Sequence, residues 1–471
     1  MKRIFTKIAV FIAILFAGFS FAACGKSSSS KIADDGTITL QYWSIYPQGD
    51  TYTPWMLEKI SQFMEQNPHI VIVHTGISFW DYFTKINTSQ SDPNGPDIFF
   101  QTITDNAARA SGGISMDLSP YFKPGELSTD DFTEMDRNAA SYKDGVYGVP
   151  FITDGRILYY NKDIVNELKN TTDAQWLATK AGKKSNTSIG GKPADLLDSS
   201  GDVRAPVTYD ELAAYSELLT LRTADRKISR LGFDLSVGNN SIMNLIFTQG
   251  GQCFDAQQKP IVDSNPGVRK AFEVWYELAR IHSIQDVNAF VGSTAGTADT
   301  VNLFWQQAVG LMIATNEIPW QNDKMSAENR INLGAAPVPF TDNNRYNFSG
   351  GFSLEISNRL QKEDPRVRQA AYDFIKFMMS DEVQRGLLIE NASMPGKLSI
   401  YEELAAAFDD PVKKTVINEM NYRRPFDFIP DAPQWWGPLF EQLTRYVSGI
   451  CDIDKALSDA QKGIEKIQRT N

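Results

Sequence analysis

The sequence has few of the residues that bind transition metals. Its 471 residues include three histidines and three cysteines, and neither an HExxH nor a CxxC motif occurs. Zinc and related ions are usually held by clustered His and Cys side chains at characteristic spacings. We therefore expect no metal site.

Cysteine is also too scarce for a disulfide framework. Cys24 directly follows the apolar start of the chain, which leaves Cys253 and Cys451. These two could pair outside a reducing compartment, or they could be buried free thiols.

Motifs for nucleotide binding and acyl transfer are missing as well. No GxGxxG fingerprint, GxSxG turn or GxxxxGK[ST] loop occurs, and the nearest match, Gly190-Gly191-Lys192, is followed by Pro193. We expect no cofactor. A glycoside hydrolase is not excluded in this way, because its two carboxylates need only be close in space.

Positive charge is in the minority. The chain has 46 Lys and Arg against 57 Asp and Glu, a formal net charge of −11. Nucleic acids and anionic lipids are bound by clustered basic residues, so we expect no nucleic-acid partner.

Long apolar runs are confined to the start of the chain. Lys2, Arg3 and Lys7 precede a continuous apolar block from residue 8 to 23. This block is shorter than the ~20 residues that span a bilayer and ends in small residues, a pattern typical of a secretory signal. We therefore predict a signal peptide at 1–23, followed by a polar, serine-rich flexible linker at 24–36.

The next segments alternate between strand and helix patterns. Strands are predicted at 37–45, 69–77 and 96–100, and amphipathic helices at 53–68 and 79–90. This order is typical of an α/β layer with a parallel sheet and right-handed crossovers.

The rest of the chain continues the mixture of helices and strands. We predict a hairpin at 142–150, strands at 307–315 and 331–340, and long helices at 265–284 and 368–388. Thr208, three residues before Glu211, predicts a capping box on another helix. Residues 170–205 have weak periodicity and are predicted to form a surface insertion.

Aromatic residues with polar neighbours are abundant. They occur in YWSIY (42–46), FWDY (79–82), NEIPW (316–320) and PQWWGP (433–438). Flat aromatic faces suit the CH-rich faces of sugar rings, while nearby polar groups bind hydroxyls, although ordinary core packing also explains single tryptophans. Trp80 falls at an element end, where cleft residues occur in α/β sheets. Of Trp435 and Trp436, we expect one to line a cleft.

Ten segments in a fixed order carry a resemblance to a known family. They are PDIFF, YKDGVYGVP, LYYNKDI, TYDEL, TQGGQCFD, AVGLMIAT, GAAPVPF, SGGFSLEIS, AAYDFIKFMMSDEVQ and ASMPGK. In this order the chain, from Thr37 to about Gln442, resembles the extracellular solute-binding proteins (family 1) of ABC importers. It is most similar to the carbohydrate-uptake group related to maltose-binding protein.

The resemblance implies a two-lobed α/β fold of the periplasmic-binding-protein type II, with discontinuous lobes and a multi-strand hinge. Lobe I would comprise 37–153 and 337–392, and lobe II 154–336 and 393–471. The implied hinge crossings lie near Thr153 to Gly155, Ala336 to Pro339 and Ala392 to Gly396. Ligand would bind between the lobes, where domain interfaces commonly form pockets.

Candidate ligand-binding positions follow from the same resemblance. Ser44, Tyr46, Trp80 and Asp105 would face the cleft, and Asp154 would lie at the hinge. Asn316 and Trp320 occupy the place of a ligand-stacking tryptophan, and Gly350, Gly351 and Phe352 form a turn close to ligand. Turn, cap or strand-entry roles are the alternatives for Asp105, Asp154 and the two glycines.

The residues Phe21-Ala22-Ala23-Cys24 resemble a lipobox, except that Phe21 stands where Leu is usual. Cys24 would then carry the lipid that anchors the exported protein to the cell membrane, facing the periplasm or the outside. The implied partners are a small carbohydrate and the transmembrane subunits of an ABC permease. We expect a monomer without enzymatic activity.

Two other functions remain open from the sequence. A surface glycoside hydrolase would need two facing carboxylates, for which Asp105 and Asp154 are the candidates. A binding protein for a non-sugar solute such as a peptide would place a cation in the cleft, for which Arg109 and Arg156 are available.

Overall fold

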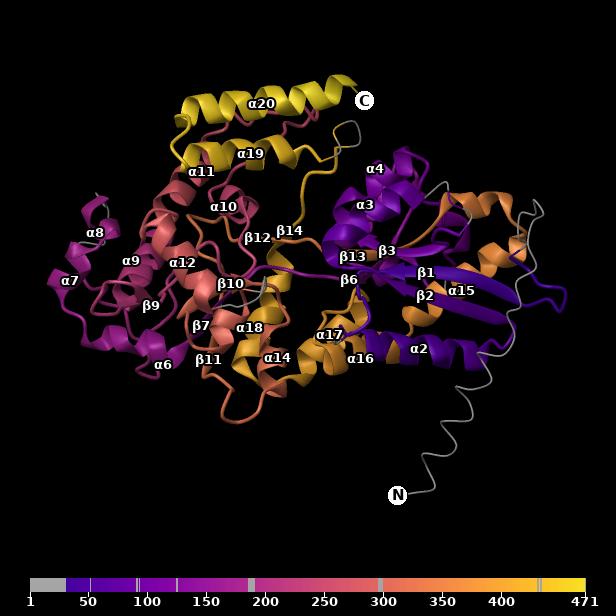
Figure 1. Ribbon diagram of the computed structural model, residues 1–471, viewed down its shortest axis with the longest axis horizontal. Helices are drawn as coiled ribbons and strands as arrows, with labels where there is room; N and C mark the ends of the chain where they lie inside the picture. Colours follow the sequence, from indigo (N-terminus) through magenta and orange to yellow (C-terminus); the bar gives the residue numbers. More distant parts are fainter. Residues whose placement is uncertain are drawn as a thin grey trace.

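The fold consists of two lobes that lie side by side. The computed structural model describes residues 31–50, 52–89, 92, 94–123, 126–184, 191–294, 300–429, 432 and 434–470. Lobe I lies on the right of Figure 1 and lobe II on the left. The signal peptide, Cys24 and most of the predicted linker therefore lie outside the described residues.

Lobe I is built on a five-stranded sheet in the order β2-β1-β3-β13-β6. The strands are β1 (Ile38–Ser44), β2 (Ile70–Gly76), β3 (Ile98–Thr102), β6 (Val149–Ile152) and β13 (Phe352–Ile356). β1 runs parallel to β2 and β3, whereas β13 runs antiparallel to β3 and β6. The parallel layer predicted from the first three strands is confirmed.

The helices of lobe I alternate with these strands and complete its core. They are α2 (Thr53–Gln66), α3 (Phe79–Ser89), α4 (Asn106–Ser111), α5 (Glu134–Ala139), α15 (Pro365–Met378) and α16 (Asp381–Asn391). Met56, Ile60 and Phe63 form the buried face of α2, as their spacing predicts. Shorter pieces are η1 (Ile103–Asp105), η2 (Ser119–Tyr121), η3 (Thr129–Asp131), β4 (Ser141–Tyr142), β5 (Gly145–Val146) and η5 (Asn358–Lys362).

Lobe II surrounds a three-stranded antiparallel sheet in the order β10-β7-β11. Its strands are β7 (Ile157–Asn161), β10 (Leu311–Ala314) and β11 (Leu333–Ala336). Two further pairs are β8 (Leu221–Arg222) with β9 (Ile228–Arg230), and β12 (Asn347–Phe348) with β14 (Arg423–Arg424).

Helices cover the lobe II sheet on several sides (Figure 1). They are α6 (Lys162–Val165), η4 (Asn166–Asn170), α7 (Asp173–Ala178), α8 (Lys180–Lys184), α9 (Tyr209–Leu219), α10 (Ile242–Thr248), α11 (Pro266–Leu278), α12 (Ile284–Thr294), α13 (Asn302–Trp305), α14 (Ile318–Lys324), α17 (Leu398–Ala407), α18 (Pro411–Glu419), η6 (Met420–Tyr422), α19 (Trp436–Val447) and α20 (Ile453–Thr470). None of the helices described has the length and apolarity to cross a membrane.

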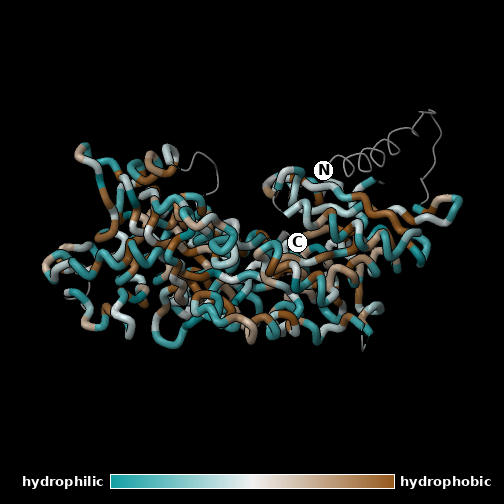
Figure 2. Tube along the Cα trace, turned by 90° about the horizontal axis from the view of Figure 1, so that it is seen from below, coloured by the Kyte–Doolittle hydropathy of each residue, from teal (hydrophilic) through white to brown (hydrophobic). Residues whose placement is uncertain are grey.

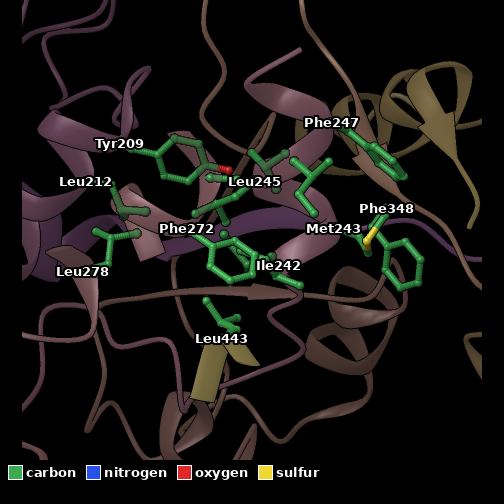
Figure 3. Close-up of a cluster of buried hydrophobic side chains, with 14 of the residues drawn as sticks. Tyr209, Leu212, Ile242, Met243, Leu245, Phe247, Phe272, Leu278, Phe348 and Leu443 are labelled. Carbon is green, nitrogen blue, oxygen red and sulfur yellow. The ribbon is translucent and has the colours of Figure 1, made fainter. Parts of the chain in front are cut away.

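Each lobe has its own hydrophobic core. In lobe II, side chains from α9, α10, α11 and α19 converge around Phe272, and Phe348 of β12 joins the same cluster (Figure 3). Figure 2 shows the hydrophobic stretches running through the interior of each lobe and hydrophilic residues at the outer turns. Lobe I buries its apolar side chains in one large cluster and lobe II in two, which allows the lobes to move as two bodies.

The chain crosses between the lobes several times. Residues 153–156 connect β6 of lobe I to β7 of lobe II, and the chain returns to lobe I at β13. Val338 and Phe348 still pack in the core of lobe II, so this return lies at 349–351, later than the expected 336–339. After α16 the chain crosses again, since Leu387 packs in lobe I and Ala392 in lobe II.

Most of the predicted elements are present, with two corrections. The hairpin is confirmed as β4 and β5. The long helix predicted at 368–388 is wrong, because α15 ends at Met378 and α16 begins at Asp381. Residues 170–205 are not wholly on the surface, since Trp176, Leu196 and Val203 are buried in the core of lobe II.

Half of the predicted capping box forms at the start of α9. Thr208 Oγ1 accepts a hydrogen bond from Glu211 N at 3.1 Å. The Glu211 carboxylate, however, accepts from Val207 N and pairs with Arg204 rather than with the Thr208 amide. Cys253 is buried and Cys451 half-buried, and both are free thiols.

Candidate functional site: a cleft between the lobes

An aromatic pocket opens between lobe I and the segment that leads into α19. Its cavity volume is about 500 Å³. Lobe I contributes Phe79, Phe83, Gln101, Thr102, Thr104, Asp105, Ala108, Arg109 and Ile114, and the segment before and into α19 contributes Phe426, Gln434 and Trp436. We call this cavity the aromatic pocket. Side chains from both sides of the cleft meet in it, as a ligand held between closing lobes requires.

Rings lie on both walls of the aromatic pocket. Phe79 and Phe83 are one turn apart on α3 and meet edge to face at 5.0 Å between centroids. Opposite them, Trp436 stacks on Phe426 at 6.2 Å. Phe79 is 40% exposed, which is high for phenylalanine and is explained by its place at the pocket mouth.

The adjacent tryptophans before α19 have different surroundings. Trp435 is buried in the lobe II core, where its Nε1 donates to the Asp427 carbonyl at 3.0 Å. Trp436 is half-buried and lines the aromatic pocket. Because neighbouring residues at the start of a helix point about 100° apart, one of the two faces inward and the other faces the cleft.

Polar groups in the aromatic pocket come from the end of β3 and from α4. Asp105, the last residue of η1, is half-buried, and its carboxylate accepts from Thr102 Oγ1 at 3.3 Å. Arg109 of α4, four residues further along the chain, also lines the pocket, and its NH2 group donates a hydrogen bond to the carbonyl of Thr102 at the end of β3. The C-terminal ends of parallel strands are where α/β proteins bind ligands.

Arg109 is held by a buried carboxylate. Its Nε donates to Glu355 at 2.9 Å and its NH2 also contacts Glu355, which is fully buried on β13. Asn106, Ser115 and Ser353 donate to the same carboxylate. This network fixes α4, and with it the polar wall of the aromatic pocket, against the sheet.

Asp154, Gly350 and Asn316 meet at the hinge and do not line the aromatic pocket. Asp154 accepts from the Gly350 amide and from Arg156 at 3.0 Å, and its carbonyl accepts from Ser349 Oγ at 2.7 Å. Asn316 Oδ1 accepts from Gly155 N at 3.3 Å. These contacts join two crossings of the chain.

Gly351 follows Gly350 in the same crossing, and its position does not tolerate a side chain. Its φ is +96°, and a Cβ there would lie 2.9 Å from the carbonyl oxygen of Ile152. Phe352 stacks on Phe100 at 4.7 Å and is half-buried at the start of β13.

Ser44 and Tyr46 lie at the end of β1 but are largely enclosed. Ser44 is fully buried, and its Oγ is 2.8 Å from His74 Nε2. Burial lowers the pKa of His74 to about 4, so the imidazole is neutral at pH 7. Tyr46 stacks on Tyr52 at 3.9 Å, and burial raises its pKa well above the ordinary value.

Trp320 lies in the lobe II core in this conformation. It is 5% exposed, meets Phe408 edge to face at 5.6 Å and has Lys413 Nζ above its ring at 5.7 Å. Trp80 belongs to α3, but its side chain lies outside what the structure describes. The roles of both in ligand binding stay predictions.

Several residues of the aromatic pocket have no distinctive local sequence pattern. Phe426 and Gln434 fall in an irregular segment, and Phe79 directly precedes Trp80, the candidate that the sequence favours. Glu317, beside Asn316, also faces the hinge. Burial and the nearby Asp154 raise the pKa of Glu317, while Arg156 lowers it. Glu317 also lies near Tyr46 of lobe I, although the two residues are far apart in the sequence.

A second pocket lies further along the cleft. Its volume is about 690 Å³, and it is bounded by α5 residues of lobe I, by the Phe254–Gln258 turn and by residues 420–429. We call it the second pocket. A cavity of only about 20 Å³, which we call the constriction, shares residues with both pockets.

Comparison with known proteins shows the family to which this two-lobed protein belongs. The family model of bacterial extracellular solute-binding proteins matches residues 49–385. The chain belongs to this family.

Relatives of this solute-binding protein resemble it over nearly their whole length. A maltooligosaccharide ABC transporter solute-binding lipoprotein of Streptococcus pneumoniae is 23% identical over 96% of this chain and 95% of its own. The diacetylchitobiose binding protein DasA of Streptomyces coelicolor is 24% identical over 99% and 97%.

Solved structures share the fold of this solute-binding protein. The protein CpMnBP1, with mannotriose bound, has a TM-score of 0.71 at 19% identity and covers 91% of this chain and 100% of its own. The GacH receptor of Streptomyces glaucescens has a TM-score of 0.67 at 19% identity, with 92% and 98% covered. The two-lobed α/β fold expected from the sequence is confirmed.

Proposed function

We propose that this solute-binding protein captures a saccharide in the aromatic pocket and delivers it to the permease of an ABC importer. The observation that carries the proposal is the pairing of aromatic faces from both sides of the cleft with a polar wall from η1 and α4. Sugar rings stack on such faces while their hydroxyls bond carboxylate and amide groups. The names of the relatives support the same class of ligand.

The competing assignments fit the side chains less well. Arg109 is bonded to Glu355 and Arg156 to Asp154, so neither cation is free to pair with a peptide carboxylate. For hydrolysis, Asp154 would have to act on substrate, yet both of its oxygens are engaged at the hinge. We therefore propose a binding protein without hydrolytic activity.

Capture and delivery follow from hinge energetics. We propose that the lobes turn about the crossings at 153–156, 349–351 and 388–394. A ligand that touches both lobes binds the closed form better and shifts the population toward it by that difference in affinity. A micromolar ligand supplies about 8 kcal/mol at standard state, which is enough to drive such a shift. The closed form would then be the form that the permease recognises.

We also propose that the protein is exported and anchored through a lipid on Cys24, as the word lipoprotein in the names of relatives suggests. Intact mass of protein extracted from membranes tests this. A mass excess of diacylglycerol on a chain beginning at Cys24 is expected, and an unmodified start at a later residue would contradict it.

The test of ligand class is calorimetry with a soluble chain that begins at Ser27. Mono- and oligosaccharides, amino acids and short peptides are titrated in turn, and one saccharide series is expected to bind. Trp436→Ala should weaken that binding about tenfold or more, because a loss of about 1.4 kcal/mol of stacking gives this factor.

Trp305→Ala is the matched control for this test. Trp305 is also a half-buried tryptophan of lobe II, but it packs on Phe304 and does not line the aromatic pocket. Its variant should lose some stability and keep saccharide affinity. Binding of peptides alone, or sustained release of reducing sugar from an oligosaccharide, would contradict the proposal.

A further inference from the structure

A short segment of chain separates the aromatic pocket from the second pocket. Residues 425–429, which we call the strap, follow β14 and run between the two lobes (Figure 1). Phe426 lines all three cavities, and Phe428 lines the constriction and the second pocket but not the aromatic pocket. The strap is therefore the wall between two cavities that are each large enough to hold a small ligand.

The constriction is far too narrow for a sugar ring. A water molecule needs about 10 to 15 Å³ of such volume. The constriction offers about 20 Å³, so it holds about one water. A saccharide in the aromatic pocket cannot continue into the second pocket unless the strap moves.

The strap is attached to both lobes, which keeps it in place. Phe428 packs against Ile103, Ala139 and Ala140 of lobe I. On the other side, Phe426 meets Phe348 edge to face at 4.8 Å, and Ile429 is buried in the lobe II core. Apolar contacts on both sides mean that a displacement of the strap would expose buried surface.

Just before the strap, an ion pair provides a second attachment to lobe I. Arg423 NH2 lies 3.1 Å from Asp136 Oδ2, and both side chains are almost fully buried. Thr153 Oγ1, at the hinge, donates to the same carboxylate at 3.4 Å. The strap thus begins at a point fixed beside the hinge.

The constriction also has a polar group without a partner. Asp427 lines both the constriction and the second pocket, and its buried Oδ2 has no hydrogen-bond partner among the described residues. A water or a hydroxyl group at the inner end of the ligand would fill this place. The inner end of the aromatic pocket therefore suits the terminus of a ligand better than the middle of one.

We propose that Phe428 and the strap limit the length of the saccharide that this protein recognises. This rests on the proposed function of the aromatic pocket as the saccharide site. Affinity should rise from one sugar unit to two and then reach a plateau. Further units either meet the strap or extend out of the pocket mouth, where they gain few contacts.

The experiment compares affinity across chain lengths. Calorimetry is run with one to four units of three series, namely maltooligosaccharides, β-1,4-mannooligosaccharides and β-1,4-linked N-acetylglucosamine oligomers. In the wild type, the dissociation constants for two, three and four units should agree within about threefold. In Phe428→Ala the constriction widens, and three and four units should bind at least about fivefold more tightly than two.

Two further variants keep the result interpretable. Phe428→Leu retains the apolar contact with lobe I and should give a smaller gain, which covers the case in which the alanine variant does not fold. Phe377→Ala removes a half-buried phenylalanine from the far side of lobe I and should leave the plateau unchanged.

The possible outcomes separate the two proposals. A wild-type affinity that keeps rising through the third and fourth unit overturns the role of the strap and leaves the saccharide assignment standing. The same holds if both Phe428 variants keep the wild-type plateau. If no saccharide of any length binds the wild type, the proposed function fails and the strap inference falls with it.

Discussion

Asp427 carries a charge in the cleft that is only partly compensated. Burial raises the pKa of its carboxyl, and Arg424 lowers it only in part, from 3.9 Å away. A carboxyl whose pKa is raised in the folded state binds a proton more readily there than in the unfolded chain. Its unfavourable contribution is therefore fully present at neutral pH and disappears as the pH falls through the folded-state pKa.

Asp427→Asn should consequently stabilise the protein at pH 7.5. A buried, poorly paired charge costs about 1 kcal/mol or more, which predicts a rise in melting temperature of about 2 °C. The difference between variant and wild type should shrink as the pH is lowered, because the wild-type carboxyl becomes protonated. Melting curves from pH 7.5 to 4 check this, with the exposed Asp263→Asn as control. A difference that grows on acidification would contradict the assignment.

Side-chain type alone does not decide which tryptophan faces the cleft. Trp320 directly follows Pro319 and Trp436 lies two residues before Pro438, yet Trp320 is in the core and Trp436 in the aromatic pocket. The difference comes from tertiary packing. Phe408 and Lys413 cover Trp320, and both are about 90 residues away in the sequence. Such contacts have no local signature.

At the scale of elements, strands and amphipathic helices could be predicted because periodicity is local. β1, α2 and β2 follow the apolar pattern closely, whereas the pattern predicts one continuous helix across the break between α15 and α16. Met379 and Ser380 continue the apolar-polar rhythm of the helix, but Ser380 adopts extended backbone at the start of α16. Serine at that position is a helix-start signal that periodicity alone does not register.

The attachment of α4 to β13 is the element-scale contact that most affects the pocket. Glu355→Gln leaves Arg109 without its buried counter-charge, which should destabilise the protein by about 3 to 5 kcal/mol. Saccharide affinity should fall as well, because Asp105 and α4 lose their fixed position. Thermal melting and calorimetry measure the two effects.

An exposed ion pair gives the comparison for this prediction. Arg385 and Glu403 form a pair with both side chains well exposed to solvent. Glu403→Gln should therefore cost no more than about 1 kcal/mol and leave saccharide affinity unchanged. Equal losses in the two variants would mean that the Glu355 network does not hold α4 as described.

At the scale of the molecule, the two-lobed fold was predictable from the order of weak motifs, whereas the cleft wall was not. The strap and the second pocket depend on contacts between residues far apart in the chain. Asp136 and Arg423 are the clearest example, since a helix of lobe I meets the chain just after α18 and η6. This ion pair joins the lobes independently of ligand.

A double-mutant cycle and X-ray scattering together test whether this pair holds the lobes. Asp136→Asn and Arg423→Gln each leave one buried polar group unpaired, so each alone should lower stability by about 3 kcal/mol, and the double variant by less than the sum. The radius of gyration of the ligand-free single variants should exceed that of the wild type, because the lobes lose a connection beside the hinge. Saturating saccharide should reduce the radius again, since ligand contacts both walls of the cleft. Additive stability losses with unchanged scattering would show that the pair stabilises β14 alone and leaves the position of the lobes to the hinge segments.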